Sequence, residues 1–480
     1  MTTRLATDFI GSREFIWRRG PVVLNRAQLV SLTEKLADNL ARLPPGARLL
    51  ALPEDPLQAA VAYGAARIAD RPLLLANDGE ALPRVIAGAR PALQLCFEQQ
   101  PAALPAALRV TLAAGEIQGN AGSIGAFSPA SSPVSSTAYE SAGSGLLDAD
   151  LIVFTSGSTG EPKAIGHRWN SLDVNSDELS LRLELDAEDH FAAMLPVFHL
   201  YGFLFNVAMA LRLGADLTAS PESVFSPGFL SGSPATVAAG ARPHLISLTG
   251  TATPRPPRLR RFVSSGGPLA PGDSARLENL WGLPVENIYG SSECMMISVN
   301  NPARGEAEQD LGLPLPSCQW RLGEDDELRV RTEKLAVGYE ISGRQEALAQ
   351  DKAGYFRSGD VARATPRGYQ ISGRLATTIN VGGKKVAPEA VEAVLRTLPG
   401  IRDAAVCAYA DPAAGERVAA ILSGEGGQDT AALRAQLIGR LAAHELPRRL
   451  LWVEALPRLD NGKLDRQALQ QLLANHLRPV

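Results

Sequence analysis

Cysteine is scarce in this sequence, which has four among 480 residues: Cys96, Cys294, Cys318 and Cys407. They lie far apart and form no C-x-x-C pair. This spacing argues against a disulfide framework and against a zinc site built on paired cysteines. Few cysteines without a pairing pattern are typical of a protein in the reducing cytoplasm.

A charge imbalance and long apolar runs are missing as well. The formal net charge is −4 with 20% charged residues, so neither nucleic acid nor a membrane surface is expected as a partner. The N-terminal stretch MTTRLATDFIGSREF lacks the apolar core of a signal peptide. The most apolar stretch, residues 199–211, is shorter than the roughly 18 residues of a membrane span. Because it also contains His199 and Asn206, we interpret it as a buried helix.

The remaining composition is that of a large globular protein. Hydrophobic residues make up 45% of the 480, and this length favours two or three domains. Strand-like and helix-like patterns alternate through much of the first 370 residues, which predicts βαβ units and a largely parallel sheet. The expected strands are 47–52, 71–76, 244–249, 260–265 and 285–290, and the expected helices are 56–69 and 270–281.

Two shifts in composition divide the chain. Residues 118–148 are dominated by Gly, Ala, Ser and Pro, which predicts a loose connection. A second shift near 368–374 is followed by helical patterns at 388–398 and 433–441. We therefore predict an α/β protein with a large N-terminal domain of βαβ-type sheets packed with helices, and a small mobile α+β C-terminal domain. The predicted domains are 1–373 and 374–480.

The stretch FTSGSTGEPKA, residues 154–164, suggests a phosphate-binding loop. Two glycines, several hydroxyls and Lys163 follow an apolar strand pattern, and such a loop can aim N–H groups and a positive charge at phosphate. It is not a P-loop, because Pro162 stands where that motif has its second glycine and Ala164 where it has a hydroxyl. A solvated serine–glycine turn is the alternative that these residues alone leave open.

Four further stretches decide between these interpretations. They are IYGSSE (288–293), YFRSGDVA (355–362), GRLATTINVGGKKVAPEAVE (373–392) and LPRLDNGKLDR (456–466). Each alone is weak, because a single Asp or Glu is more often a turn or surface residue. With the loop, in this order and spacing, they resemble the superfamily of adenylate-forming (AMP-binding) enzymes. That superfamily includes acyl-CoA and aryl-CoA synthetases, nonribosomal adenylation domains and luciferases.

The resemblance implies an ATP-dependent, Mg²⁺-requiring ligase. An aryl or fatty acyl carboxylate attacks the α-phosphate of ATP, which gives an acyl-adenylate and pyrophosphate. A thiol then displaces AMP and forms a thioester; the thiol belongs to CoA or to the phosphopantetheine of an acyl carrier protein. Two alternatives stay open: a stand-alone adenylating enzyme with a non-thiol acceptor, and a degenerate nucleotide-binding scaffold.

The resemblance also implies roles for single residues. Catalysis is expected at Lys463, Ser292, Glu293 and His199, with Glu293 also the metal ligand. Nucleotide and cofactor binding is expected at Thr155, Ser156, Gly157, Ser158, Thr159, Lys163, Gly266, Gly267, Tyr289, Gly290, Asp360, Arg374 and Gly383. Within this set Tyr289 stacks on adenine, and Asp360 accepts the ribose hydroxyls. Lys463 offsets the negative charge that gathers as the carboxylate approaches the α-phosphate.

Two departures from the family pattern bear on the substrate and the hinge. His199 stands where relatives that activate amino acids have an aspartate, and an imidazole is a poor partner for an ammonium group. This favours an aryl or fatty acid. Ala376 stands at the expected hinge, where relatives have Asp or Lys, so the hinge can rotate but has no salt bridge in either orientation.

Overall fold

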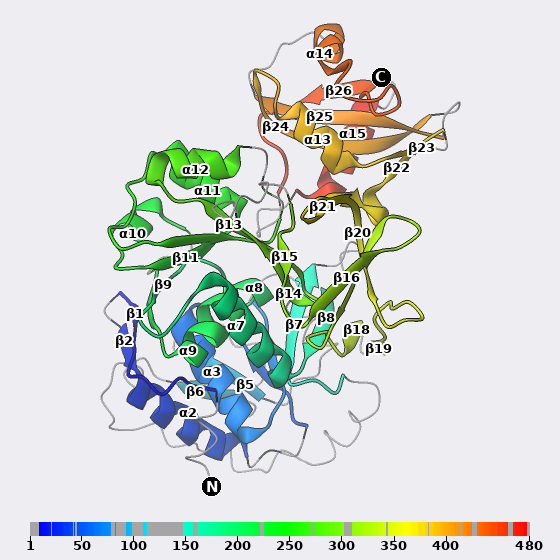
Figure 1. The fold of residues 1–480 in the computed structure, drawn as a ribbon. Helices are drawn as coiled ribbons and strands as arrows, with labels where there is room; N and C mark the ends of the chain where they lie inside the picture. Colours follow the sequence, from blue (N-terminus) through cyan, green and yellow to red (C-terminus); the bar gives the residue numbers. More distant parts are fainter. Residues whose placement is uncertain are drawn as a thin grey trace.

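The computed structural model describes most of the chain. The described residues are 9–20, 22–41, 43, 46–77, 82, 93–97, 109–112, 147–156, 162–220, 225–267, 269, 272–301, 310–341, 344–382, 384–411, 415–424, 430–458 and 464–477. The predicted connection 118–148 therefore lies almost wholly outside them. Figure 1 shows two large sheets with helices in the body of the molecule and a smaller C-terminal sheet at the end far from α2.

The first large sheet has nine strands in the order β15-β14-β13-β12-β11-β9-β10-β1-β2. Its middle strands pair in parallel, whereas β2, β14 and β15 pair antiparallel at the two edges. Its strands are β1 (Ile16–Arg19), β2 (Val22–Asn25), β9 (His190–Ala193), β10 (Asp216–Ala219), β11 (Val237–Gly240), β12 (Arg261–Ser264), β13 (Val285–Ser291), β14 (Met295–Asn300) and β15 (Leu313–Pro314).

The second large sheet has eight strands in the order β19-β18-β8-β7-β4-β3-β5-β6. Strands β7, β4, β3, β5 and β6 pair in parallel, and β8, β18 and β19 continue the sheet with antiparallel pairs. Its strands are β3 (Leu49–Ala51), β4 (Leu73–Leu75), β5 (Leu93–Phe97), β6 (Arg109–Leu112), β7 (Leu151–Ser156), β8 (Pro162–His167), β18 (Gly338–Ile341) and β19 (Arg344–Glu346).

The main core lies between these two sheets. In β3, Leu49 and Ala51 join the central cluster while Leu50 joins a separate one, as expected because successive strand residues point to opposite faces. The helices that fill the space are α2 (Arg26–Leu40), α3 (Pro56–Ala69), α7 (Trp169–Leu183) and the continuous segment α8 (Leu200–Phe203), η2 (Leu204–Met209) and α9 (Ala210–Leu213). This last segment confirms the buried helix predicted at 199–211. The part of the chain that the structure describes has no helix long and apolar enough to cross a membrane.

Local sequence explains where α3 begins. Asp55 lies just before it in an extended conformation, and its carboxylate accepts a hydrogen bond from the Gln58 N–H at 3.0 Å. Pro56 follows at the first turn, where a missing N–H costs nothing. The helix ends at Asp70, which adopts the left-handed conformation. The predicted helix 56–69 is therefore confirmed to its boundaries.

The prediction of a strand at 244–249 is wrong. These residues belong to the helix α11 (Arg242–Gly250). Pro243 stands in the first turn, and Leu245 and Leu248 lie one turn apart and are fully buried in the cluster that α11 forms with α12 (Asp273–Trp281) and the nine-stranded sheet. A buried strand and a buried helix cannot be distinguished from a short apolar run alone. Here the helix allows Leu245 and Leu248 to pack on the same side. The short helix α10 (Pro227–Ser231) completes this outer layer.

A four-stranded antiparallel sheet follows, which the expected βαβ alternation did not foresee. Its order is β16-β17-β20-β21. The strands are β16 (Cys318–Leu322), β17 (Glu327–Thr332), β20 (Phe356–Thr365) and β21 (Gly368–Arg374). β21 leads through the short 3-10 helix η4 (Leu375–Thr377) into the C-terminal domain.

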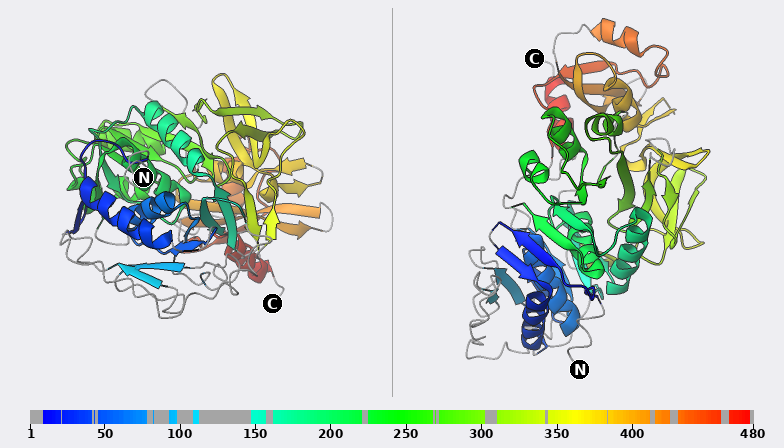
Figure 2. Two further views of the ribbon diagram at one scale, coloured as in Figure 1. Left: turned by 90° about the horizontal axis from the view of Figure 1, so that it is seen from below. Right: turned by 60° about the vertical axis from the view of Figure 1, so that its left-hand side comes forward.

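The C-terminal domain has its own sheet and its own core. Figures 1 and 2 show it as a separate unit beyond β20 and β21. Its elements are β22 (Ile379–Val381), β23 (Lys384–Val386), α13 (Pro388–Leu395), β24 (Ile401–Asp411), β25 (Gly415–Gly424), α14 (Thr430–Leu437), β26 (Arg449–Trp452) and α15 (Arg466–Leu477). The predicted α/β fold with a small α+β C-terminal domain is confirmed. The boundary at 373/374 and the mobility of this domain remain predictions.

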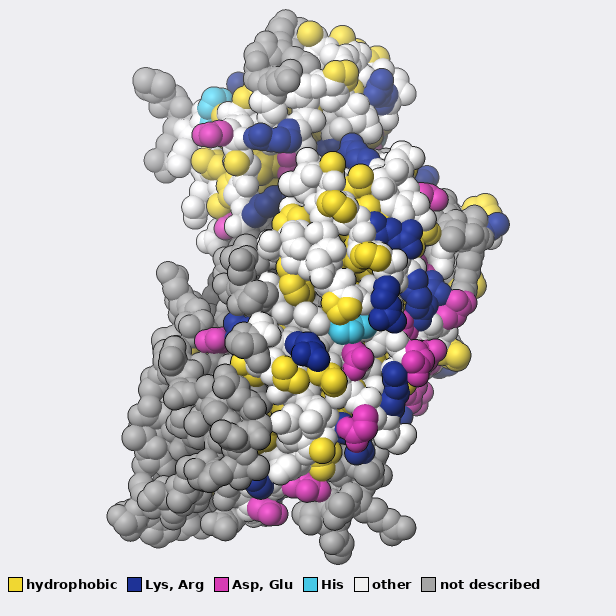
Figure 3. Space-filling model, turned by 90° about the vertical axis from the view of Figure 1, so that its left-hand side faces the viewer, with side chains coloured by type: hydrophobic (Ala, Val, Ile, Leu, Met, Phe, Trp, Pro, Cys, Tyr) yellow, Lys and Arg dark blue, Asp and Glu magenta, His cyan; other side chains and the backbone are white. Residues whose placement is uncertain are grey.

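Charges of both signs share the surface. On the face drawn in Figure 3, Lys and Arg side chains of the large domain are interspersed with Asp and Glu. This mixture agrees with the small net charge of −4.

Candidate active site

Tyr289, Asp360 and Arg374 meet at one point, as the sequence predicted. Tyr289 Oη donates to Asp360 Oδ2 at 2.7 Å, and Arg374 Nε lies 2.7 Å from Asp360 Oδ1. The Asp360 side chain is only 6% exposed, and β20 and β21 pair these two charged residues directly. Burial raises the pKa of Asp360, while the guanidinium and the tyrosine hydroxyl oppose the rise. The carboxylate is thus held in one orientation, and each oxygen retains acceptor capacity.

A tight hairpin carries Ser292 and Glu293 away from this point. It joins β13 to β14 through residues 292–294, and Met295 at its end has a φ of +57°. Such a conformation in a non-glycine residue is unusual and is often found at functional sites. Gly290 is required here because a Cβ would lie 2.4 Å from the Met295 carbonyl oxygen. The hairpin therefore fixes the distance between Tyr289 and Glu293.

Three hydrogen bonds hold this hairpin in place. The His167 ring lies with Nε2 2.9 Å from the Ser292 carbonyl oxygen, and the Ala336 N–H donates to the Glu293 carbonyl at 2.7 Å. The Cys294 N–H donates to Ser291 Oγ at 3.1 Å. Burial lowers the pKa of His167 to about 4, so the ring is neutral and Nε2 is the donor. Ser292 and Glu293 are thereby preorganised on a rigid support.

The predicted phosphate loop connects two antiparallel strands. Thr155 pairs with Lys163 and Ser156 with Pro162 at the open end of β7 and β8. In a P-loop, a helix would begin at the position of Pro162. Here the loop is followed by the strand β8 instead, so no helix N-terminus is needed after it. Lys163 Nζ lies 4.5 Å from the centre of the Tyr339 ring.

Tyr339 also reaches the metal-ligand candidate. Its hydroxyl donates to Glu293 Oε1 at 2.9 Å. One tyrosine therefore brings together Lys163 of the phosphate loop and Glu293 of the hairpin. Neither Tyr339 nor His167 was predicted from the sequence. Their partners lie 46 and 125 residues away, and no local motif signals such contacts.

Gly266 and Gly267 follow the carboxyl end of β12, beside β13. Ser265 Oγ donates to the Ile288 carbonyl at 2.9 Å and ties the two strand ends together. Both glycines are exposed, no atom lies within 4 Å of an added Cβ at either, and Gly266 has a φ of +83°. The structure thus brings this open segment beside β13, the strand that carries Tyr289.

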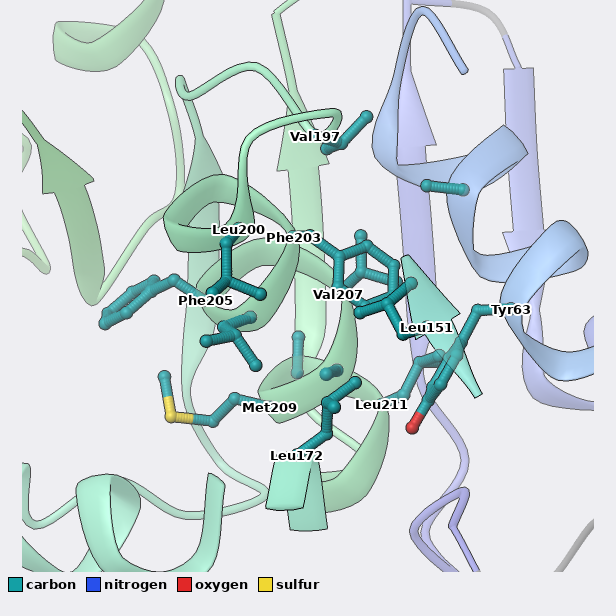
Figure 4. Packing of buried hydrophobic residues seen from close by; sticks show 14 of the residues in the cluster. Tyr63, Leu151, Leu172, Val197, Leu200, Phe203, Phe205, Val207, Met209 and Leu211 are labelled. Atoms are coloured by element: carbon teal, nitrogen blue, oxygen red, sulfur yellow. The ribbon is translucent and has the colours of Figure 1, made fainter. Parts of the chain in front are cut away.

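His199 lies immediately before α8, one of the helices between the two large sheets. It is half-buried, and its ring centroid is 4.5 Å from that of Phe198. The turn before it is tight, since a Cβ on Gly202 would lie 2.1 Å from the Pro196 carbonyl oxygen. Further along the helix, Phe203 packs against Tyr63 at 5.3 Å in the core (Figure 4). His199 is thus a half-buried polar residue at the start of a largely apolar helix.

Five predicted site residues lie outside the described part of the chain. They are Gly157, Ser158, Thr159, Gly383 and Lys463. Their roles remain predictions that rest on the sequence resemblance alone.

The donor set at Glu293 fits Mg²⁺ better than a dedicated metal cage. The described residues contain no group of three or more His, Cys, Asp and Glu side chains arranged to hold a metal ion. Mg²⁺ usually binds through one or two carboxylates together with substrate phosphates and water. A single half-buried carboxylate, oriented through Oε1 and placed near a phosphate loop, meets this requirement.

The described candidate residues therefore form two groups, Tyr289 with Asp360 and Arg374, and Glu293 with Tyr339 and Lys163. Comparison with known families gives the class. The sequence profile of the AMP-binding enzyme family matches residues 73–339, and that of the AMP-binding enzyme C-terminal domain matches residues 390–463. The chain belongs to this family of AMP-binding enzymes.

Curated relatives are CoA ligases and adenylating enzymes. An indoleacetate–CoA ligase of Aromatoleum aromaticum is 29% identical over 68% of this chain and 67% of its own length. A salicylyl-CoA synthase/salicylate adenylyltransferase of a Streptomyces species is 28% identical over 68% of this chain and 63% of its own length. A medium-chain fatty-acid–CoA ligase of Escherichia coli is 27% identical over 68% and 61%, respectively. The matches thus span about two thirds of these relatives.

Solved structures share the fold along nearly the whole chain. ATP-bound MatB from Rhodopseudomonas palustris superposes with a TM-score of 0.84 at 22% identity, covering 99% of both chains. The amide bond synthetase McbA from Marinactinospora thermotolerans gives a TM-score of 0.80 at 23% identity, covering 98% of this chain and 99% of that one. These similarities establish the fold.

Proposed function

We propose that this protein activates a carboxylic acid with ATP and transfers the acyl group to a thiol. One observation carries the proposal: the end of β13 and the turn after it connect the two groups of residues that would bind the two ends of a nucleotide. Tyr289 binds Asp360 at one end, and Glu293, four residues later, meets Lys163 through Tyr339 at the other. The ribose of ATP needs hydrogen-bond acceptors, and its polyphosphate needs positive charge. The two groups of residues offer these along one surface in the same order.

At the nucleoside end, the Asp360 carboxylate accepts the two ribose hydroxyls. Tyr289 and Arg374 already orient it, so little side-chain freedom is lost on binding. The Tyr289 ring provides an apolar face for adenine, and the open glycine segment at Gly266 leaves room for the base beside β13.

At the phosphate end, catalysis depends on charge placed in advance. A carboxylate oxygen attacks the α-phosphorus, and the bond to the bridging oxygen breaks to release pyrophosphate. Lys163 neutralises the departing phosphates, Ser292 donates to the α-phosphate, and Lys463 bridges the incoming carboxylate and the α-phosphate. Glu293 would hold Mg²⁺, which when bound shields the β- and γ-phosphate charge.

The second half-reaction transfers the acyl group. A thiolate attacks the acyl carbon of the adenylate, and AMP leaves with the oxygen of the mixed anhydride. We propose CoA as the thiol, because several curated relatives are named CoA ligases. The C-terminal domain rotates near Ala376 between the two steps, which removes Lys463 from the site and brings the segment at Gly383 to the pantetheine arm.

Aryl or medium-to-long acyl carboxylates are expected to support ATP–pyrophosphate exchange at least ten-fold better than any amino acid. The reason is His199, which offers no negative charge to an ammonium group. A ten-fold preference corresponds to about 1.4 kcal/mol, less than one good charged contact. A panel of carboxylates in the exchange assay measures it.

The variant His199→Asp sharpens this test. It introduces the missing negative charge and should improve exchange with amino acids relative to aryl acids. His199→Gln is the matched polar control and should leave the ranking unchanged. If an amino acid gives the fastest exchange with the wild-type protein, the proposed substrate class is wrong. If no acid supports exchange, the alternative of a degenerate nucleotide-binding scaffold remains.

A further inference from the structure

We propose that Tyr339 is a positioning residue that couples the phosphate-loop lysine Lys163 to the metal-binding carboxylate Glu293. This inference rests on the proposed function. The tyrosine uses two different parts for the two partners: its ring face meets Lys163 Nζ at 4.5 Å, and its hydroxyl donates to Glu293 Oε1 at 2.9 Å. An ammonium over an aromatic face and a phenol on a carboxylate are both attractive contacts.

Strand pairing places the ring where Lys163 can reach it. Tyr339 lies in β18 directly opposite Ile165 of β8, and the two strands are antiparallel. Lys163 is two residues from Ile165 and therefore projects from the same face of the sheet. Diagonal neighbours of this kind are within reach of aromatic and long side chains.

The strand that carries Tyr339 is itself firmly anchored. The next residue, Glu340, points to the opposite face and forms a buried ion pair with Arg48, with an N–O distance of 2.8 Å and both side chains under 5% exposed. Glu340 Oε2 also accepts the Leu147 N–H at 3.0 Å. A tyrosine on such a strand offers a fixed point of contact for both side chains.

Residues 336–339 form hydrogen bonds with both the backbone and the side chain of Glu293. Its backbone carbonyl accepts the Ala336 N–H at 2.7 Å, and its carboxylate accepts the Tyr339 hydroxyl. The hydroxyl binds Oε1 and so orients the carboxylate that would hold a metal. Partners that orient a metal ligand typically contribute 10–100-fold to metal affinity or activity.

Two substitutions separate the two contacts. Tyr339→Phe keeps the ring under Lys163 and removes the hydroxyl from Glu293, so the Mg²⁺ concentration for half-maximal activity should rise about ten-fold. The KM for ATP at saturating Mg²⁺ should stay near the wild-type value. Tyr339→Leu also removes the ring face, and its KM for ATP should rise about three-fold above the wild-type value.

Tyr355 supplies the matched control. Its ring likewise lies under cations, Arg321 and Arg331, at 4.6 and 5.1 Å, and its hydroxyl is 3.4 Å from Gln319 Oε1. It lies immediately before β20 and packs against arginines of β16 and β17, outside the candidate site. Tyr355→Phe and Tyr355→Leu should therefore change neither the Mg²⁺ dependence nor the KM for ATP.

A binding experiment gives a readout that does not depend on turnover. Mn²⁺ binding in the presence of ATP, measured by electron paramagnetic resonance, should weaken about ten-fold in Tyr339→Phe, while AMP binding by calorimetry and the melting temperature stay at wild-type values. Unchanged Mn²⁺ binding would overturn the inference, and so would parallel losses of AMP binding and thermal stability, which indicate a structural role. If the wild-type protein itself binds no nucleotide, the proposed function fails instead.

Discussion

Replacing Lys463 by alanine is expected to slow adenylate formation by about 10² or more, the usual scale for losing one preorganised charge in a transition state. Thioester formation from chemically prepared acyl-adenylate should proceed at nearly the wild-type rate. The difference is expected because, in the proposed mechanism, the lysine acts in only one orientation of the C-terminal domain. Single-turnover measurements of the two half-reactions test this directly.

The outcomes of this experiment distinguish three situations. Loss of both half-reactions together would mean that the domain does not rotate or that the variant is misfolded, which its melting temperature reveals. Loss of neither would make Lys463 a surface lysine and remove its assigned role. Lys352→Ala is the matched control, because that exposed lysine lies outside the candidate site and should leave both rates unchanged.

Replacing Asp360 by alanine is expected to weaken the use of ATP by ten-fold or more. Hydrogen bonds to a charged group contribute about 1.5–3 kcal/mol each, and this carboxylate would accept two ribose hydroxyls. The substitution also leaves Tyr289 and Arg374 without their shared partner. The KM for ATP, together with calorimetric binding of AMP, measures the effect.

Two further variants separate ribose binding from support of the site. Asp360→Asn keeps an acceptor of the same shape but removes the charge, so its loss should be smaller than that of the alanine variant. Tyr289→Phe removes the 2.7 Å hydrogen bond to Asp360 and keeps the ring for adenine. If Asp360→Ala retains the wild-type KM, rate and AMP affinity, Asp360 has no part in nucleotide binding and is only a structural residue of β20.

Elements with strong local signals were predicted well from the sequence. Helix α3 has an N-cap aspartate, a proline in the first turn and a continuous apolar pattern, and its boundaries agree with the prediction. The strand at 260–265 was likewise confirmed as β12. Helix α11 was mistaken for a strand because its short apolar run has no distinguishing period, and the burial of Leu245 and Leu248 appears only after folding.

The candidate site was predictable where motifs exist and not where it depends on long-range contacts. Tyr289, Asp360 and Arg374 lie on three stretches named from the sequence, and the fold brings them within hydrogen-bonding distance. His167 and Tyr339 support the same site from β8 and β18. Their importance follows from strand pairing between segments far apart in the chain, which no local pattern encodes.

The central claim is that the protein joins a carboxylate to the adenylyl group of ATP. Product analysis with ATP labelled at the α-phosphate, and in a parallel reaction at the γ-phosphate, tests it most directly, in the presence of Mg²⁺, an aryl or fatty acid and no thiol. We expect acid-dependent formation of acyl-adenylate and an equal amount of pyrophosphate, and conversion of the adenylate to AMP and thioester when CoA is added. Formation of ADP and phosphate, or nucleotide turnover that does not depend on the acid, would contradict it.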